Sequence, residues 1–386
     1  MPVHPAARTG TIRTGAIRTA ALGALLLLAT ACGDEAAPAG AGGPIAVEAS
    51  DDACKVARTS ADTGNVTFEV TNKGSKVTEF YLFAEGDRIL GEVENIGPGL
   101  TRRLIVEVTE AGKLQTACKP GMKGDGIRGE FTVSGEGRKS TDADAKLAEA
   151  TKGYQRYVTS QADSLLAKTT EFVDAVKAGD VDEAKALFPV ARTYWERVEP
   201  VAESFGDLDP KIDGREDVLE EGAEFTGFHR LEKDLWQDGL KADSPAVADR
   251  LLTDVKDVVT RAKAVELTPL QLANGAKELL DEVATGKITG EEDRYSHTDL
   301  WDFRANVDGS QAAVAALRPV IEERDAALVA SVDEKFEALD GLLEEHRAGD
   351  GFKLYTELSE DEVKALAAAV DALGEPISKV AEVVSR

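Results

Sequence analysis

The chain has 386 residues, of which 30% are charged, and its formal net charge at pH 7 is −26. A surface this acidic repels nucleic acid and anionic lipid headgroups and attracts cations, so we expect no nucleic-acid partner. The length is sufficient for two domains.

The first residues are typical of an exported protein. Arginines without acidic residues precede an apolar run, Ala20–Ala29, which is too short to span a bilayer but suits a signal peptide. Small residues then precede Cys32, in an arrangement that is similar to a bacterial lipobox. We therefore predict a lipoprotein signal peptide over residues 1–31, lipidation of Cys32 and a flexible tether over residues 32–44. The alternative is an ordinary signal peptide cut after an Ala-x-Ala-like site, with no role for Cys32.

Export has consequences for the rest of the chain. No apolar run long enough to span a bilayer follows the signal segment, so a lipid on Cys32 is the only membrane attachment that the sequence predicts. The predicted location is the extracytoplasmic side of the cell membrane, within the cell envelope. Cys54 and Cys118 remain as a pair, and in an exported chain an even pair is a disulfide candidate by default.

Residues 45–134 have the pattern of β-structure. Val66–Thr71 alternates apolar and polar residues with a period of two, and a turn signal with Asn72 and Gly74 follows it. Further short strands are predicted at residues 77–83, 104–108 and 129–133. Strands of this length and spacing predict a β-sandwich.

Beyond a polar linker predicted over residues 135–144, the apolar residues recur at helical spacing to the end of the chain. The predicted fold class is therefore multidomain, with an N-terminal β-sandwich followed by an all-α helical bundle over residues 145–386. One helix is expected around residues 216–235. The long connections over residues 203–215 and 286–310 are candidates for loops that build a site.

One short motif inside the helical region is a candidate metal site. His229 and Glu232 lie three residues apart, so they share one face of the predicted helix. An imidazole and a carboxylate on one face can bind a metal, and the chain has only four histidines. The alternative is a histidine that is packed or hydrogen-bonded without a metal.

Other candidate ligands come from three separate segments. Glu196 and Glu199 share a helix face beside Pro200, where the missing N–H should kink the helix. Asp213 lies in an acidic stretch, and His297 follows another acidic stretch beside aromatic residues. A solvated acidic face is the alternative for each carboxylate. Two imidazoles with carboxylates suit zinc, iron or a similar cation. The His-Glu-x-x-His pattern of zinc peptidases is absent from the sequence.

These segments resemble two known families. The helical region resembles the imelysin or M75 family, which is marked by Gly-x-His-x-x-Glu, here Gly227, His229 and Glu232, and the similarity extends through residues 195–200, 208–213, 295–303 and 305–309. The β-region is similar to the cupredoxin-like domain found before imelysin domains in EfeO proteins, through residues 77–80, 91–99 and 118–122. Together the two resemblances cover nearly the whole mature chain and indicate an EfeO-type iron-uptake protein.

The resemblance implies a cargo, partners and ligands. EfeO-type proteins work in the cell envelope with a membrane iron permease, EfeU, and a haem-containing peroxidase-like protein, EfeB. We therefore expect iron, as Fe2+ or Fe3+, to be the cargo, with zinc and copper as the other metals to consider. The family motif makes His229 and Glu232 the first metal candidates, and the matching segments add Glu196, Glu199, Asp213 and His297. No catalytic residue is expected, so the chain is predicted not to be an enzyme. The alternatives are an M75-type metallopeptidase and a non-catalytic surface binding module.

The cupredoxin-like region gives a separate expectation. It contains no histidine, so a conventional blue-copper site of two His, a Cys and a Met is not expected. Cys118 and Met122 nevertheless keep a cupredoxin-like spacing. A second site for iron or copper would use Cys54, Cys118, Met122 and Glu79, with Glu92 and Glu94. The alternative is a disulfide between the two cysteines, and the two states would interconvert with redox conditions.

Overall fold

The computed structural model of the chain describes residues 43–205, 208–217, 219, 222 and 224–386. Residues Ala41 to Arg386 form one compact unit. The predicted signal peptide, Cys32 and most of the predicted tether lie outside the described residues. Among the described residues, no helix is long and apolar enough to cross a membrane.

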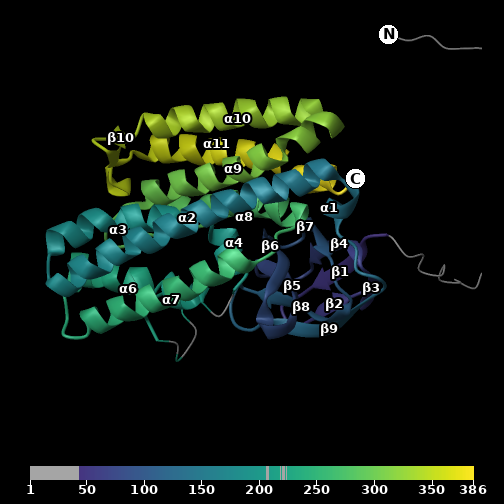
Figure 1. Ribbon diagram of the computed structural model, residues 1–386, viewed down its shortest axis with the longest axis horizontal. Helices are drawn as coiled ribbons and strands as arrows, with labels where there is room; N and C mark the ends of the chain where they lie inside the picture. The colour runs from purple at the N-terminus through teal and green to yellow at the C-terminus, as the bar shows by residue number, and fades with distance from the viewer. Residues whose placement is uncertain (1–42, 206–207, 218, 220–221, 223) are drawn as a thin grey trace, which may run out of the picture. The chain divides into compact units, whose positions relative to one another are not determined.

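The first part of the compact unit is a sandwich of two sheets (Figure 1). One sheet has the strand order β2-β1-β4-β7 and the other has the order β3-β9-β8-β5-β6. The strands are β1 (Ile45–Ala49), β2 (Cys54–Val56), β3 (Ser60–Asp62), β4 (Gly64–Asn72), β5 (Thr78–Phe83), β6 (Ile89–Ile96), β7 (Thr101–Val108), β8 (Gly112–Pro120) and β9 (Ile127–Ser134). β1 runs parallel to β4 and β3 parallel to β9, whereas the other pairs are antiparallel.

Apolar side chains fill the space between the two sheets. The ring of Phe68 from one sheet lies 5.1 Å from the ring of Phe80 and 5.4 Å from that of Phe131, which both belong to the other sheet. The alternation in β4 that predicts a strand places Val66, Phe68 and Val70 in this core, since a strand turns successive side chains to opposite faces. Cys54 and Cys118 form a disulfide that joins the two sheets. Of the two alternatives for this pair, the structure contains the disulfide.

The remainder of the unit is mainly helical, and Figure 1 shows its long helices lying side by side. They are α1 (Ser140–Ala143), α2 (Ala145–Ala178), α3 (Val181–Glu196), α4 (Glu199–Glu203), α5 (Asp209–Ile212), α6 (Gly227–Lys233), α7 (Ser244–Ala264), α8 (Pro269–Thr285), α9 (Asp299–Arg324), α10 (Ala326–Glu344), α11 (Glu360–Ile377) and α12 (Val380–Val384). Capping residues in the sequence determine where several of these helices begin or end. Asp144 caps α2, the left-handed Gly179 ends it, and Thr268 with Gln271 forms a capping box at α8.

Two predictions for this region need correction. The all-α prediction is wrong in detail, because a hairpin of β10 (Arg347–Ala348) and β11 (Gly351–Phe352) follows α10. The expected helix over residues 216–235 is also wrong, since α6 begins only at Gly227 and continues into a π-helical turn over Asp234–Asp238. The backbone around Thr226 and Gly227 instead lies against the end of α5.

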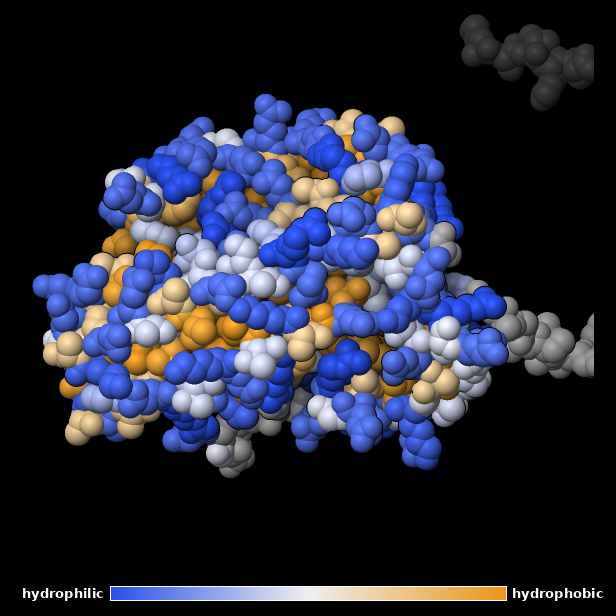
Figure 2. Space-filling model, viewed as in Figure 1, coloured by the Kyte–Doolittle hydropathy of each residue, from blue (hydrophilic) through white to orange (hydrophobic). Residues whose placement is uncertain are grey.

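Two apolar cores within the helical region leave a polar zone between them. α6 contributes Phe228 and Leu231 to one core, and α9 contributes Leu300 and Phe303 to the other. Figure 2 shows that the outer face in view is mostly hydrophilic, with apolar residues in narrow bands. The buried charges of the protein therefore gather where α3, α6 and α9 meet inside the helical region.

Candidate metal centre

Gly227 explains how the motif helix is placed. Its φ of +81° is in the left-handed region, and a Cβ at this position would lie 2.1 Å from the carbonyl oxygen of Ile212. Only glycine permits so close a backbone approach. The approach brings the start of α6 against the end of α5, where Asp213 follows Ile212, and Thr226 donates a hydrogen bond to the Lys211 carbonyl (2.9 Å). The glycine of Gly-x-His-x-x-Glu thus brings Asp213 beside His229.

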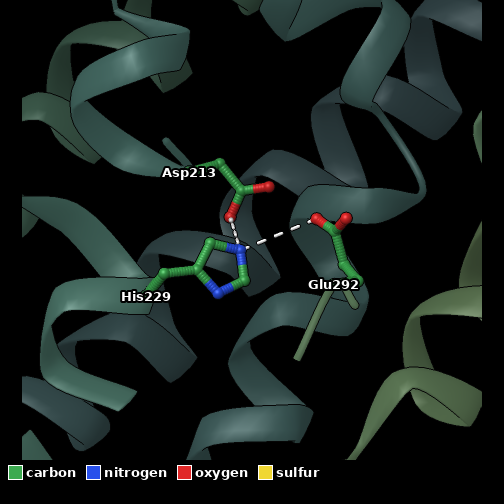
Figure 3. A group of neighbouring side chains, drawn as sticks. All are labelled: Asp213, His229 and Glu292. Atoms are coloured by element: carbon green, nitrogen blue, oxygen red, sulfur yellow. Dashed lines mark ion pairs between the residues drawn. The ribbon is translucent and has the colours of Figure 1, made fainter. Parts of the chain in front are cut away.

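The ring of His229 points one nitrogen at two carboxylates from different segments (Figure 3). Nε2 lies 3.5 Å from Asp213 Oδ1 and 3.6 Å from Glu292 Oε1. It has no hydrogen-bond partner among the described residues, although the ring is only 2% exposed. Metal–ligand bonds of about 2.1 Å place neighbouring ligand atoms about 3.0–3.4 Å apart in octahedral or tetrahedral shells. The three atoms lie within 4.8 Å of one another, slightly farther apart than in a filled shell, and Arg192 also lies near Asp213 Oδ1 and Glu292 Oε1. A cation bound here would draw the three ligand atoms together and share the two oxygens with Arg192.

Glu232 holds the other side of the same ring. Its Oε2 lies 2.9 Å from His229 Nδ1, and its Oε1 accepts hydrogen bonds from the backbone N–H groups of Tyr295 (2.9 Å) and Ser296 (2.8 Å). Histidines that bind metals commonly donate their second ring nitrogen to a carboxylate, which fixes the ring orientation. The geometry thus favours Glu232 as the residue that positions His229, while His229, Glu232 and Asp293 form a second group of the right size for a cation.

The fully buried guanidinium group of Arg192 lies among these carboxylates. Arg192 of α3 contacts Asp213, lies 2.5 Å from Glu196 Oε1 and 3.0 Å from Asp302 Oδ2, and reaches Asp293 at 3.3 Å. Burial lowers the pKa of Arg192, but the surrounding carboxylates more than offset this and raise it well above its usual value. Arg192 therefore remains charged and partly compensates the acids.

A second buried cation occupies the neighbouring carboxylate pair. The break between α3 and α4 places Glu196 and Glu199 together, as the predicted kink near Pro200 requires. Lys287 Nζ, with 0% exposure, lies 2.9 Å from Glu196 Oε2 and 3.2 Å from Glu199 Oε2. Asn306 Nδ2 also donates to both acids (3.1 Å each). Glu196, Glu199 and Asp213 are close enough to hold a cation, but an ammonium group already lies among their oxygens.

These contacts determine the charge states of His229 and Glu292. Desolvation and the charge of Arg192 lower the pKa of His229, but Asp213, Glu232 and Glu292 reverse the effect and raise it to about 10. Burial raises the pKa of Glu292, but Lys287 and His229 bring it well below its usual value. At neutral pH the centre thus contains an imidazolium beside the ionised Glu292, whereas burial raises the pKa values of Asp293 and Asp302 well above their usual range. A cation binding at Nε2 must displace a proton.

A small cavity connects the centre to the surface. Its volume is about 10 Å3, and its lining includes His229, Glu232 and Glu292 together with the exposed Glu216 and Asp217. That volume is roughly what one water-sized sphere occupies. The dimensions suit a single ion. Arg215 and Arg294 also line the cavity, and Arg294 pairs with Asp217 and Lys233 with Glu216, so the entrance is charged with both signs.

The structure brings together most of the predicted ligands. Asp213 and Glu292 come from the two long connections predicted to build a site, but Glu292 was not itself predicted. His297 belongs to none of the cation-sized groups among the described residues, and its backbone, at φ 59°, accepts a hydrogen bond from Tyr355 N (2.8 Å). Sequence reasoning also missed Arg192 and Lys287, since a lone basic residue in a helical pattern gives no signal of burial.

The predicted second site in the β-sandwich is not assembled. Cys118 pairs across the sheet with Phe80, and both are fully buried in the core, while Glu79 pairs with Lys119 and lies on the opposite face. Because side chains alternate between faces, Cys118 and Glu79 cannot bind one ion. Met122 is 40% exposed on a loop.

Glu79 instead belongs to an acidic group between the sandwich and α8. Tyr81 Oη donates to Glu79 Oε2 (2.8 Å) and to Glu94 Oε1 (3.3 Å). Glu92 of β6 and Glu278 of α8 line one cavity. Burial and the charge of Glu79 raise the pKa of Glu92 to about 8, and burial and the charge of Glu92 raise the pKa of Glu278 well above its usual value. We call Glu79, Glu92, Glu94 and Glu278 the interface cluster.

The fold and the site together define a two-part protein, a β-sandwich joined to a helical domain with a buried His-carboxylate centre. The imelysin family model matches residues 150–380, and the cupredoxin-like domain model matches residues 19–133. The chain is 38% identical over 342 residues to proteins named "Iron uptake system component EfeO" from Escherichia coli O157:H7, E. coli strain K12 and Shigella flexneri, which covers 87% of this chain and 90% of each relative.

The chain therefore belongs to the imelysin family, and within it to the EfeO-type proteins that carry a cupredoxin-like domain. The resemblance predicted from its motifs is confirmed. The prediction that it is not an enzyme agrees with these relatives, which are named as components of an uptake system.

Proposed function

We propose that this protein is the iron-binding component of an EfeO-type uptake system in the cell envelope. It captures Fe2+ or Fe3+ in the helical domain and passes the ion to an EfeU-like membrane permease, with an EfeB-like haem peroxidase as a further partner. Lipidation of Cys32 would hold it at the outer side of the cell membrane.

One observation supports this proposal above the others. His229 Nε2 is buried, lacks a hydrogen-bond partner among the described residues, and faces Asp213 and Glu292. A buried polar atom without a partner is costly unless the site has another occupant. One imidazole with hard carboxylates is a donor set that both oxidation states of iron accept. The relatives are named as components of an iron uptake system, which favours iron as the metal.

We assign different roles to the predicted ligands. His229, Asp213 and Glu292 would bind the ion, and Glu232 would orient His229 through Nδ1. Glu196 and Glu199 would stay with Lys287 and support the centre from outside.

Titration of the metal-free protein tests the assignment. Isothermal titration with Fe2+ under anaerobic conditions, and separately with Fe3+ supplied as its nitrilotriacetate complex, should give one ion per chain. Glu292→Gln and His229→Gln should each weaken binding at least about tenfold, and Glu232→Gln should weaken it about 10- to 100-fold, as loss of an orienting carboxylate does elsewhere.

Glu337→Gln is the control, because it removes an exposed carboxylate of α10 that does not line the cavity of the centre, and it should leave the affinity unchanged. Unaltered affinity and stoichiometry in His229→Gln would contradict the site. Delivery is tested with vesicles that contain an EfeU-type permease, where wild-type protein should support iron uptake and His229→Gln should not.

A further inference from the structure

A wide cleft opens on the helical region and shares no lining residue with the metal centre. It lies between α3, α9 and the β10–β11 hairpin, elements that Figure 1 shows at one end of the helical region. Its volume is about 320 Å3. Small-molecule sites in proteins usually have volumes of about 300–1,000 Å3. The cleft is therefore large enough for a small organic ligand.

The lining is unusual for so acidic a chain. The lining includes three guanidinium groups, from Arg197, Arg304 and Arg347. It also includes three aromatic rings, from Tyr194, Trp301 and Phe352. Two carboxylates, Asp308 and Asp350, also line it. Arginine and aromatic side chains together are the groups that recognise flat anions, since guanidinium groups pair with carboxylates and rings stack on planar faces.

The arginines are held in place before any ligand arrives. Asp308 accepts from Arg197 at 2.8 Å and pairs with Arg304 at 2.7 Å, and Arg304 also pairs with Asp340 at 2.5 Å. A guanidinium carries five N–H donors, so these contacts leave donors for a further acceptor. The three arginine side chains remain 20–42% exposed.

The hairpin side of the cleft is fixed by close packing. The Arg347 guanidinium lies 4.2 Å from the centre of the Phe352 ring, which packs edge-on against Trp301 with ring centres 5.6 Å apart. Gly351 permits this packing, because a Cβ there would lie 2.3 Å from the Trp301 ring. The hairpin therefore presents Arg347 and the Phe352 ring to the cleft beside Trp301 of α9. Arg347 also pairs with Glu344 at 3.2 Å, so a ligand would bind to its remaining donors.

We propose that this cleft is a binding site for a small planar organic anion that carries carboxylate groups. Its carboxylates would pair with the guanidinium groups, with Arg347 as the most exposed partner, and its plane would pack against Trp301 and Tyr194. The net charge of −26 opposes anion binding elsewhere on the surface. The site is independent of the metal centre and goes beyond the proposed uptake function.

Phthalate, a flat aromatic dicarboxylate, is the probe for the experiment. Isothermal titration of the metal-free full chain should show one phthalate site, with quenching of tryptophan fluorescence. Tricarballylate, which has carboxylates but no ring, and benzamide, which has a ring but no charge, should each bind at least tenfold more weakly. Arg347→Gln should reduce phthalate affinity at least tenfold. Arg347→Lys keeps the positive charge but loses the planar guanidinium group, so it should retain more affinity than the glutamine variant.

Arg318→Gln is the control, since Arg318 also lies on α9, is 41% exposed and pairs with Asp333 outside the cleft. It should bind phthalate as the wild type does. Glu292→Gln should also bind phthalate normally, which separates this site from the metal centre. Failure of phthalate to bind at millimolar concentration, or equal binding by folded Arg347→Gln and wild type, would overturn the proposal.

Discussion

The metal centre and the interface cluster are both groups of acids, but they are neutralised differently. In the interface cluster Glu79 is buried, whereas Glu92, Glu94 and Glu278 are half-buried. In the metal centre, Arg192 and Lys287 lie among the carboxylates with no exposed surface. In the interface cluster, the cation in contact is Lys119, which lies over the Tyr81 ring at 4.3 Å and is partly exposed.

The two arrangements lead to different charge states for Glu292 and Glu92, although burial also raises the pKa values of Glu199, Asp293 and Asp302 in the metal centre well above their usual range. Buried cations and His229 hold the pKa of Glu292 well below its usual value, despite the burial that raises it. Burial and the charge of Glu79 raise the pKa of Glu92 to about 8, so protons neutralise the interface cluster at neutral pH. A carboxylate that nearby cations keep ionised, as Glu292 is, can attract a metal, whereas a protonated carboxylate such as Glu92 packs as an uncharged group.

Removing the central guanidinium should have the largest effect on this contrast. Arg192→Met would leave Asp213, Glu196 and Asp302 without their shared cation. Breaking a buried ion pair by removing one partner typically costs about 3–5 kcal/mol. Urea unfolding at pH 7 should show a loss of that size, and an added divalent cation should restore part of it. Arg318→Met, at an exposed pair, should cost less than about 1 kcal/mol, and equal losses in the two variants would contradict the role of Arg192.

Replacing the second buried cation should make room for an ion. Lys287→Met removes the ammonium from between Glu196 and Glu199, which should cost about 2–3 kcal/mol in metal-free protein because Asn306 still donates to both acids. The freed oxygens should then accept a second cation. In titrations with Mn2+, the number of ions bound per chain should rise from one to two. Lys277→Met, at the Asp281 pair on α8, should keep one ion, and an unchanged stoichiometry in Lys287→Met would refute this role for the ammonium.

Much of the fold could be predicted because its signals are local. The period-two pattern of Val66–Thr71 places one face of β4 in the core, and Pro269 with the Thr268 capping box sets the start of α8. The spacing of His229 and Glu232 predicts that they share a helix face, and His229 Nδ1 lies 2.9 Å from Glu232 Oε2.

The rest of the site could not be predicted because it depends on contacts between distant segments. Arg192 meets Asp302, which is 110 positions away, and Lys287 meets Glu199, which is 88 positions away. The role of His297 stays a prediction, since His297 belongs to none of the cation-sized groups among the described residues. Gly227 was recognised as part of a motif, but its close approach to Ile212 is visible only in three dimensions.

Proton release should make metal binding at the ionised centre depend on pH. The acids Asp213, Glu232 and Glu292 raise the pKa of His229 to about 10 against the opposing effects of burial and Arg192. The imidazole therefore carries a proton that a metal must displace below that pH. Affinity for Fe2+ should rise about tenfold per pH unit between pH 6 and pH 8, equivalent to about 1.4 kcal/mol per unit. Anaerobic competition titrations measure the slope, His229→Gln should flatten it, and a flat slope in the wild type would contradict displacement of this proton.

The smallest expected effect belongs to the interface cluster and has the opposite dependence. Because the pKa of Glu92 is raised in the folded protein, the folded state retains a proton that the unfolded chain loses as pH rises from about 4.5 to about 8. The free energy of unfolding should therefore fall over this range, which is the direction expected when the native state binds more protons. Glu92→Gln stays uncharged, so it should match the wild type near pH 4 and exceed it by about 1–2 kcal/mol at pH 9, measured by thermal and urea unfolding. Glu130→Gln, at an exposed position of β9, should show no such pH dependence. If Glu92→Gln changed stability equally at both pH values, protonation would not be what neutralises the interface cluster, and the contrast with the metal centre would disappear.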